Sequence, residues 1–377
     1  MNIGFEAKRV FRNFTGLGNY SRATVKALSE NFPENHYFLY TPETKGLLNS
    51  SLNLQANNIT IRTAPVKALK AIWRILQINK NLAEDKIDIF HGLSGELPLN
   101  IRKSGIPSVV TIHDLIFIRY PHYFKPIDRN IYKYKFRKAC INADRIIAIS
   151  EQTKRDIIQF FNISPDKIDI VYQGCDPIFS IRSTEKELET VKRKYQLPNE
   201  FLLCVGTIEQ RKNQLLILKA LKLVPKHIKL VLVGKPTAYK TELINFAESN
   251  KLTDRIIFLE KVPFIDLPVI YQLAKIFVYP SRFEGFGIPL LEAISCGIPT
   301  IGATGSCLEE AGGPDSMYTS PDNEKELANY INTIIQSESI CQNMIEKGLE
   351  YTRQFSEENI ARNLMNVYQK ALRNVQR

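Results

Sequence analysis

Two glutamates eight positions apart mark the segment of this chain that is best equipped for binding and chemistry. Glu284 stands in Pro280-Ser-Arg-Phe-Glu-Gly-Phe-Gly-Ile-Pro-Leu-Leu-Glu-Ala293, and Glu292 falls about one turn into the helix that Pro289 helps to start. The apolar run Ile276–Tyr279 before it is typical of a buried strand. A strand, a glycine loop and a helix N-terminus in this order offer backbone N–H groups and a positive dipole end to a diphosphate. The carboxylates add acceptors for sugar or ribose hydroxyls.

The alternative for this segment is a helix whose acidic first turn only complements its dipole. That alternative explains neither the two glycines of the loop nor the glutamate before them. The segment resembles the E-x7-E signature of retaining, nucleotide-sugar-dependent glycosyltransferases with the GT-B fold, in the large family numbered 4. The resemblance implies that Glu284 faces the donor sugar and that Glu292 holds the nucleotide ribose. It also implies backbone contacts to the sugar and diphosphate from Gly285, Phe286, Gly287 and Ile288.

A second segment, Val205-Gly-Thr-Ile-Glu-Gln-Arg-Lys-Asn213, places two cations between a predicted strand and a predicted helix. Adjacent cations at this point are well placed to neutralise a diphosphate leaving group. Two merely exposed cations in a first helical turn would oppose the helix dipole. Arg211 and Lys212 match the basic pair that holds the donor phosphates in the family. Thr207 stands where some relatives carry an additional arginine, so the match of Lys212 is closer than that of Arg211.

Three further positions carry smaller signals. Thr15-Gly-Leu-Gly-Asn-Tyr20 follows the first predicted strand and is either a tight turn or, as the resemblance implies, a loop in which Gly16 and Gly18 let backbone amides approach the donor phosphate. His113 ends an apolar strand, where a histidine is either a structural residue or, in the family, a contact to the donor sugar. His91 ends another strand and is a weaker candidate for contact with the acceptor.

Metal and thiol chemistry have little support in the sequence. The chain contains no Asp-x-Asp, the carboxylate pair with which many sugar transferases bind Mg²⁺ or Mn²⁺. We therefore expect no metal and no other cofactor, with cations and helix dipoles stabilising the leaving group. The six cysteines form no Cys-x-x-Cys pair, and we expect reduced residues that serve in packing.

Strand-like and helix-like runs alternate along all 377 residues, a length that suits two domains. The predicted strands of the first half are Asn2–Phe5, Tyr37–Tyr40, Ile59–Arg62, Ile87–His91, Ser108–His113, Arg145–Ile149 and Ile168–Tyr172. Those of the second half are Phe201–Val205, Lys229–Val233, Arg255–Leu259, Ile276–Tyr279 and Thr300–Ile301. Among the helical patterns are Tyr20–Glu30, Val66–Leu82, Gln152–Phe161 and Ser356–Leu372.

This alternation predicts an α/β protein with two Rossmann-like parallel-sheet domains that face each other across a cleft, as in the GT-B fold. The turn-rich residues after Tyr172 are the expected linker. We expect an N-terminal acceptor domain over residues 1–173, completed by a C-terminal crossover helix within 356–377. A nucleotide-sugar donor domain is expected over residues 174–355.

The basic residues are concentrated in the first half of the chain. Residues 1–173 carry 25 Lys and Arg against 15 Asp and Glu, and the segment Arg119–Lys138 holds seven cations and one acid. Such a surface suits nucleic acid, an anionic membrane or an acidic acceptor, or is simply a solvated helix face. The aromatic residues mixed with cations in 131–138, and the tryptophan in 68–76, favour a peripheral protein that meets a lipid-linked acceptor at a membrane. No nucleic-acid-binding motif is present, so we expect no nucleic-acid partner.

Together these features predict a metal-independent, retaining glycosyltransferase that moves a sugar from a nucleoside diphosphate to an acceptor hydroxyl. The segments around Lys212 and His113 most resemble mannosyltransferases that use GDP-mannose in bacterial surface-polysaccharide assembly, and UDP-sugars stay open as donors. The acceptor is expected to be a saccharide or a lipid-linked saccharide. The absence of a long apolar N-terminal run predicts a cytoplasmic protein. The cations and aromatics of 131–138 predict that it is peripheral on the inner face of the membrane. A nucleotide-sugar 2-epimerase with a similar double-Rossmann fold is the alternative.

Overall fold

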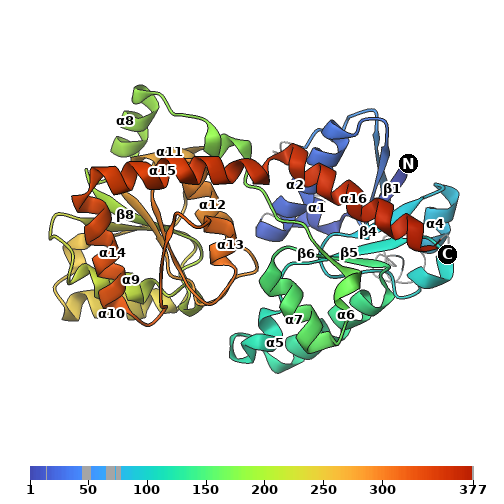
Figure 1. The fold of residues 1–377 in the computed structure, drawn as a ribbon, viewed down its shortest axis with the longest axis horizontal. Coiled ribbons are helices and arrows are strands. Elements are labelled where there is room, and N and C mark those ends of the chain that lie inside the picture. The colour runs from blue at the N-terminus through green and yellow to red at the C-terminus, as the bar shows by residue number, and fades with distance from the viewer. Residues whose placement is uncertain (14, 45–51, 65–72, 74–77, 376–377) are drawn as a thin grey trace. The chain divides into compact units, whose positions relative to one another are not determined.

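The computed structural model describes residues 1–13, 15–44, 52–64, 73 and 78–375. The chain divides into two compact units (Figure 1). Unit 1 comprises Met1–Gln173 and Phe355–Arg377, and unit 2 comprises Gly174–Gln354. The sequence-based division placed the first boundary at the same residue and the return of the chain one residue later.

The centre of unit 1 is a parallel sheet in the order β3-β2-β1-β4-β5-β6-β7. Its strands are β1 (Asn2–Glu6), β2 (His36–Thr41), β3 (Ile59–Thr63), β4 (Ile89–Gly92), β5 (Ser108–Ile112), β6 (Arg145–Ala148) and β7 (Ile168–Ile170). In register, β1 pairs with β2 from Asn2 opposite His36 to Glu6 opposite Tyr40. All seven predicted strands are present, within two residues of their predicted ends.

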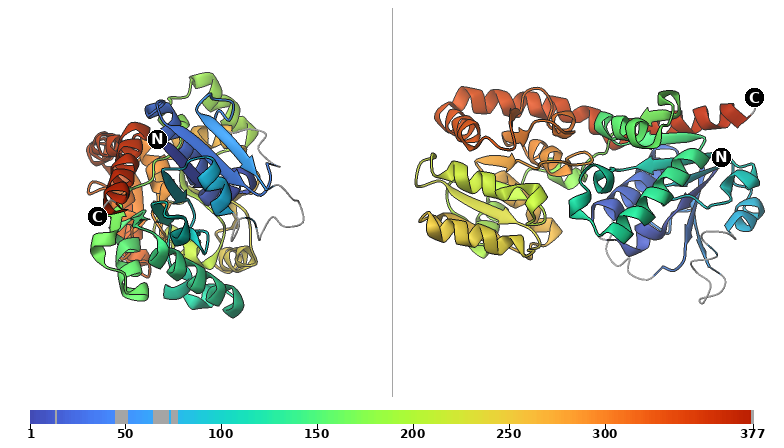
Figure 2. Two further views of the ribbon diagram at one scale, coloured as in Figure 1. Left: turned by 90° about the vertical axis from the view of Figure 1, so that its right-hand side faces the viewer. Right: turned by 90° about the horizontal axis from the view of Figure 1, so that it is seen from below.

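Helices cover both faces of this sheet (Figures 1 and 2). They are α1 (Lys8–Arg12), α2 (Gly16–Asn31), α4 (Ile78–Glu84), α5 (Ile116–Arg119), α6 (Pro126–Asn142), α7 (Glu151–Phe161) and α16 (Glu357–Val375). Successive strand residues point to opposite faces, so Val109 packs with α1, α2 and α16 while Val110 packs with α5, α6 and α7. Because both faces are covered, the strands are apolar at consecutive positions, as a buried parallel sheet requires.

The N-terminus of α2 depends on a close backbone approach. The amide of Gly18 donates to the Thr15 carbonyl and to Oδ1 of Asn13, at 2.9 and 3.1 Å. A Cβ atom on Gly18 would lie 1.8 Å from the backbone oxygen of Asn13, whereas a Cβ atom on Gly16 would meet nothing within 4 Å. The second glycine of this loop is therefore required by the turn itself.

The last helix, α16, completes the core of unit 1. Ser356 caps it, because its Oγ accepts the Asn359 amide at 3.3 Å. It lies beside α2 (Figure 1), and residues such as Leu364 and Tyr368 of its apolar face belong to the core. Lys26 of α2 also donates to the carboxylate of Glu357, at 2.7 and 2.9 Å. The predicted helix and its N-cap are confirmed.

Unit 2 has the same architecture, with a parallel sheet in the order β10-β9-β8-β11-β12-β13. Its strands are β8 (Phe201–Val205), β9 (Lys229–Val233), β10 (Ile256–Leu259), β11 (Ile276–Tyr279), β12 (Thr300–Ala303) and β13 (Met317–Thr319). Its helices are α8 (Glu185–Lys194), α9 (Gln214–Leu221), α10 (Tyr239–Ser249), α11 (Leu267–Leu273), α12 (Ile288–Ser295), α13 (Leu308–Gly312), α14 (Glu324–Gln336) and α15 (Glu338–Thr352). Both units are Rossmann-like, as predicted.

Short elements such as β13 and α1 were not among the predicted strands and helices, because segments of three and five residues are too short for a periodic pattern to show. Of the predicted helix 66–82, the part from Ile78 is helical, and 66–72 and 74–77 lie outside the described residues. No helix in the described part of the chain is long and apolar enough to cross a membrane.

The two glycines at the start of α2 allow a matched test of this turn. We expect Gly18→Ala to lower the free energy of unfolding by about 3 kcal/mol or more, because backbone must move to admit the methyl group. Gly16→Ala should change stability by no more than about 1 kcal/mol, in the stabilising direction, since alanine favours a helix over glycine. Urea denaturation of both variants measures the contrast. Equal effects would show that the turn relaxes around Gly18.

Candidate active site

The predicted site residues of unit 2 meet where the strand order of the sheet reverses. The chain leaves β8 toward β9 on one side, while β11 pairs with β8 on the other. In open parallel sheets the crevice beyond the carboxyl ends of two such strands binds ligands. The loop after β8 carries Arg211 and Lys212, and the loop after β11 carries Glu284. Strand order therefore brings together residues that stand some seventy positions apart in the chain.

One oxygen of Glu284 is the centre of this site. Its Oε1 lies 2.7 Å from Nζ of Lys212 and 2.8 Å from Nη1 of Arg211. The same oxygen accepts hydrogen bonds from the hydroxyl groups of Ser281 at 2.5 Å and of Tyr279 at 3.1 Å. Two cations and two hydroxyls thus fix a single carboxylate, whose side chain is only 12% exposed.

These contacts decide the charge of the carboxyl group. Burial alone would raise the pKa of Glu284, but the positive charges of Lys212 and Arg211 outweigh it and lower the pKa to about 2. Glu284 is therefore an anion throughout the physiological range. An ion-paired carboxylate of this kind is a strong hydrogen-bond acceptor and a poor nucleophile.

Each cation is also held from a second side. Arg211 donates to the Phe283 carbonyl at 2.7 Å and to Glu209 at 2.6 Å. Lys212 donates to the hydroxyl of Tyr279 and lies over its ring, 4.9 Å from the centroid. The two cations and the two glutamates of this cluster carry opposite charges in equal number. The cluster is therefore close to neutral, and its donors have little freedom to move.

Residues at the start of α13 hold the loop between β11 and α12 in place. Cys307 lies 3.1 Å from the carbonyl oxygens of both Glu284 and Phe286, to which its thiol donates. Gly287 is the N-cap of α12 with φ of +120°, and a Cβ atom there would lie 2.8 Å from a methyl group of Leu308. The loop thus needs glycine at this position. Ile288 then begins α12, so the predicted order of strand, glycine loop and helix is confirmed.

Glu292 lies one turn inside α12 and has a very different environment. Its Oε2 accepts a hydrogen bond from the hydroxyl group of Tyr271, a fully buried residue of α11, at 2.8 Å. Burial raises the pKa of Glu292 to about 7, and the Tyr271 hydrogen bond offsets only part of that rise. Glu284 and Glu292 therefore differ in protonation near neutral pH, although they lie on one loop and the helix that follows it.

The remaining predicted residues lie in unit 1. His113 directly follows β5, is 8% exposed, and its Nε2 donates to the carbonyl of Leu93 at 2.9 Å. Burial lowers the pKa of His113 to about 4, so its ring is neutral at physiological pH. The ring of Tyr20 meets it edge-on at 4.5 Å, which connects His113 to the helix that Gly16 begins.

His91 does not have the exposure that contact with an acceptor requires. It is fully buried, and its ring nitrogens are hydrogen-bonded to Thr111 and to Tyr368 of α16, both at 2.8 Å. The predicted acceptor contact is therefore wrong. A histidine at the end of a strand was ambiguous in the sequence, because nothing there showed that α16 returns to cover it.

Several residues that shape the site were not singled out from the sequence. Ser281 and Tyr279 stood in or beside the glutamate motif, and their closeness to Glu284 was a usable signal. Tyr271 and Cys307 reach the site only through the packing of α11 and α13. No spacing in the sequence connects them with the two glutamates.

The chain matches known protein families over most of its length. A model of the family described as Glycosyltransferase Family 4 matches residues 14–178, and a model described as Glycosyl transferases group 1 matches residues 185–351. The chain is 30% identical over 386 residues to the O-antigen chain mannosyltransferase B of Escherichia coli, across 98% of this chain and 99% of that protein. The chain belongs to the family 4 glycosyltransferases.

Solved structures of low sequence identity share the fold of this glycosyltransferase. Sucrose-phosphate synthase from Thermosynechococcus elongatus is 19% identical, with a TM-score of 0.79 over 99% of this chain and 100% of that one. The Anabaena protein Alr3699/HepE in complex with UDP and glucose is 18% identical, with a TM-score of 0.76 over 98% and 100%. The fold is thus the GT-B fold, and the enzyme is a sugar transferase.

The contrast between the two glutamates predicts how stability depends on pH. The folded-state pKa of Glu292 is raised from 4.5 to about 7, so its contribution to stability is complete below about pH 4.5 and is lost as the pH rises through 7. Glu292→Gln removes this loss. Relative to the wild type, the variant should gain about 1–3 kcal/mol between pH 5 and pH 8.5, as measured by urea denaturation.

Glu284→Gln is the matched control for that experiment. The pKa of Glu284 is lowered to about 2, so its stabilising contribution is present above pH 4.5 and is lost only as the pH falls toward 2. Its variant should be less stable than the wild type by a constant amount between pH 5 and pH 8.5. Parallel profiles for Glu292→Gln and the wild type would contradict the raised pKa.

Proposed function

We propose that this enzyme is a retaining transferase that moves mannose from GDP-mannose to a hydroxyl group of a saccharide or lipid-linked saccharide, in surface-polysaccharide or glycolipid assembly. The observation that carries the proposal is the Glu284 carboxylate, held by Arg211 and Lys212 at the point where the sheet order reverses. The E. coli mannosyltransferase that is similar along the whole chain supports mannose as the sugar.

The groups around Glu284 suit the parts of a nucleotide sugar. Its second carboxylate oxygen is available for the hydroxyl groups of the sugar ring, since the interactions of the carboxylate described above are made by Oε1. Arg211, Lys212 and the backbone of 285–288 are proposed to bind the diphosphate, and Glu292 the ribose diol. Gly16 and His113 of unit 1 are proposed to contact the phosphate and the sugar. Gly18 is assigned to shaping the loop, because its amide is already bonded there.

The chemistry that follows needs no covalent intermediate on the protein. The bond between the anomeric carbon and the diphosphate oxygen breaks, and the acceptor oxygen bonds to the same face of that carbon. The acceptor proton passes to the departing diphosphate. Glu284, which is proposed to face the sugar, is held by four donors and is a weak nucleophile, which favours this front-face route.

Stabilisation of the leaving diphosphate is proposed to come from protein groups without a metal ion. Lys212 is 11% exposed and oriented by two partners, so it meets developing charge without reorganising. Among the described residues there is no group of three or more His, Cys, Asp and Glu that could hold a metal ion.

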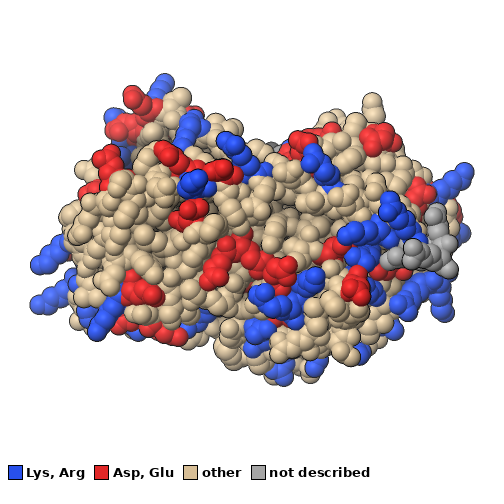
Figure 3. All heavy atoms as spheres, in the orientation of Figure 1, with Lys and Arg blue, Asp and Glu red and all other residues tan. Residues whose placement is uncertain are grey.

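The acceptor is proposed to bind unit 1, because residues 1–173 carry 25 Lys and Arg against 15 Asp and Glu. Figure 3 shows some of these charged side chains on one face. A cytoplasmic protein that touches the inner face of the membrane through this unit would meet a lipid-linked saccharide there. Anionic lipids attract each basic residue near the surface by about 1 kcal/mol, so a cluster of cations suffices for reversible attachment.

Binding of donors tests the proposal directly. GDP-mannose should raise the thermal midpoint of the protein more than UDP-glucose or UDP-galactose, since a ligand that binds the folded state stabilises it. Glu292→Ala should weaken binding of GDP-mannose and of free GDP alike, by about 1–3 kcal/mol, because the ribose diol loses its acceptor. Isothermal titration calorimetry measures both affinities.

The exposed Glu309→Ala is the control for that variant and should bind like the wild type. Unchanged affinity of Glu292→Ala for free GDP would remove Glu292 from the ribose site. A larger thermal shift with a UDP-sugar would show that the donor is a UDP-sugar and not GDP-mannose. The Anabaena protein was solved in complex with UDP.

Turnover in the presence of a chelator tests the source of charge neutralisation. EDTA should leave the mannose transfer rate nearly unchanged, whereas Lys212→Ala should lower kcat by about 100-fold or more. Lys219→Ala, on the exposed side of α9, is the matched control and should retain full activity. Activity that EDTA abolishes and Mn²⁺ restores would show that a metal ion takes the role proposed for Lys212.

A further inference from the structure

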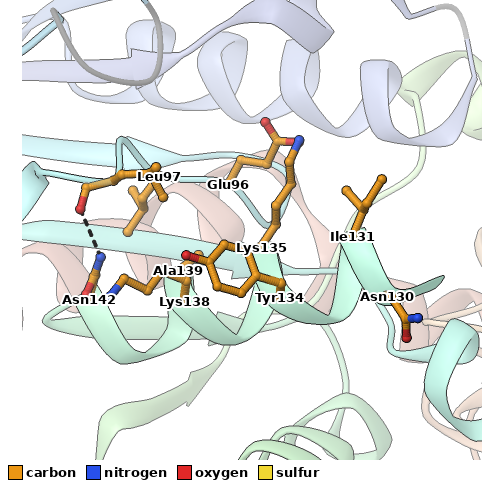
Figure 4. Close-up of a pocket in the computed structure, with 10 residues that line it drawn as sticks. Glu96, Leu97, Asn130, Ile131, Tyr134, Lys135, Lys138, Ala139 and Asn142 are labelled. Atoms are coloured by element: carbon orange, nitrogen blue, oxygen red, sulfur yellow. Dashed lines mark hydrogen bonds and ion pairs between the residues drawn. The ribbon is translucent and has the colours of Figure 1, made fainter. Parts of the chain in front are cut away.

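A groove of about 390 Å³ runs along α6 of unit 1, and none of the residues proposed to bind the donor lines it (Figure 4). One wall is the face of α6 that carries Ile131, Tyr134 and Lys138, and the other is the loop that follows β4, with Leu97 and Leu99. Ala139 lies buried between them. The groove is therefore formed by a helix and a loop that are distant in sequence.

Both walls are held in place by specific contacts. Gly95 has φ of +72°, and a Cβ atom there would lie 2.6 Å from the ring of Phe136 on α6. Phe136 in turn packs edge-on against Phe117 of α5, with ring centroids 5.2 Å apart. Toward the C-terminus of α6, Asn142 donates to the carbonyl of Leu99 at 3.4 Å. The loop thus lies directly on the helix without closing over the groove.

The groove exposes apolar side chains that a folded protein usually covers. Leu99, Ile131 and Tyr134 are 42%, 46% and 63% exposed. Each apolar side chain of this size gains about 1.5–3 kcal/mol when it leaves water completely. A cluster of them around one groove indicates a binding surface for an apolar ligand.

The charges around the groove define what kind of apolar ligand fits. Lys135 and Lys138 stand on its rim, and Lys135 reaches Glu96 at 3.4 Å across it (Figure 4). The same helix carries Arg129, Lys133 and Arg137, with Asp128 as its one acid. A second copy of this chain would bring the same positive helix and be repelled. An apolar floor with a basic rim instead suits an amphiphile with an anionic head.

The loop that walls the groove also supports the proposed acceptor side of unit 1. It begins at Leu93, whose carbonyl accepts from Nε2 of His113, and the Gly95 amide donates to the Thr111 carbonyl of β5 at 2.8 Å. A ligand in the groove therefore lies against the loop that orients His113. This is the end of the sheet at which ligands bind in this fold.

We propose that the groove between α6 and residues 96–99 binds one aliphatic or isoprenoid chain of an anionic bilayer lipid, whose phosphate meets Lys135 and Lys138. Only the identity of that lipid as carrier of the acceptor rests on the proposed function. Binding of the chain is a property of unit 1 alone, so it is measured without a sugar donor. A failure here leaves donor use untouched, and a failure of donor use leaves the groove untouched.

The experiment uses phosphatidylglycerol with a diazirine in one acyl chain, diluted into phosphatidylcholine vesicles. After photolysis, mass spectrometry of the full-length protein should place the crosslinks on residues 131–139 and 97–99. Ile131→Glu and Leu99→Glu, on opposite walls, should each lower co-sedimentation with these vesicles at least about tenfold, because a charge in the groove costs more than about 1.4 kcal/mol. Both positions are exposed, so folding should survive, which a thermal melt verifies.

Ile181→Glu is the matched control, since Ile181 is 64% exposed and lies in unit 2. It should bind vesicles like the wild type. Crosslinks spread over the surface of α6, or vesicle binding that salt abolishes while Ile131→Glu leaves it unchanged, would overturn the proposal in favour of charge attraction alone. Dimers in sedimentation velocity that dissociate on Ile131→Glu would also overturn it, because a second copy would then occupy the groove.

Discussion

The candidate site of this transferase depends on one carboxylate that is shared by two cations. A buried anion is costly unless it is paired. Glu284 forms ion pairs with two cations and also accepts hydrogen bonds from two hydroxyl groups. The pairing is possible only because β8 and β11 are neighbours where the sheet order reverses. Cys307, through its hydrogen bonds, and Gly287, through its close packing on Leu308, then fix the loop in the position from which Glu284 contacts Lys212. The strand order, the loop geometry and the ion pairs therefore all serve to hold the Glu284 carboxylate in one position.

In unit 1, a group of hydrogen-bonded polar side chains lies inside the core. Tyr20, Thr111, His91 and Tyr368 form a buried chain of hydrogen bonds that crosses from α2 through β5 and β4 to α16. Every member has a partner, so the chain costs little and fixes the position of each element relative to the sheet. His113 lies beside this chain, against the ring of Tyr20, and its orientation follows from it.

The sequence predicted most of the fold, because buried parallel strands leave consecutive apolar residues that are visible without any structure. It also singled out Glu284, Lys212 and Arg211 as candidates, since glycines and adjacent cations after a strand have few structural uses. It could not show that these three form a cluster, because contact between loops depends on strand order. Tyr271 was out of reach for the same reason, and His91 was misassigned because α16 covers it from the far end of the chain.

The return of α16 to unit 1 has a consequence for how the chain folds as it is made. Ala361, Leu364 and Tyr368 belong to the core beneath α2, yet the ribosome adds them only after all of unit 2. Residues 174–354 are continuous, so unit 2 holds its whole core before α16 is made, whereas the face of the first sheet that α16 completes has only α1 and α2 on it until then. Translation normally favours folding from the N-terminus. Here we expect unit 1, although it is synthesised first, to complete its core last.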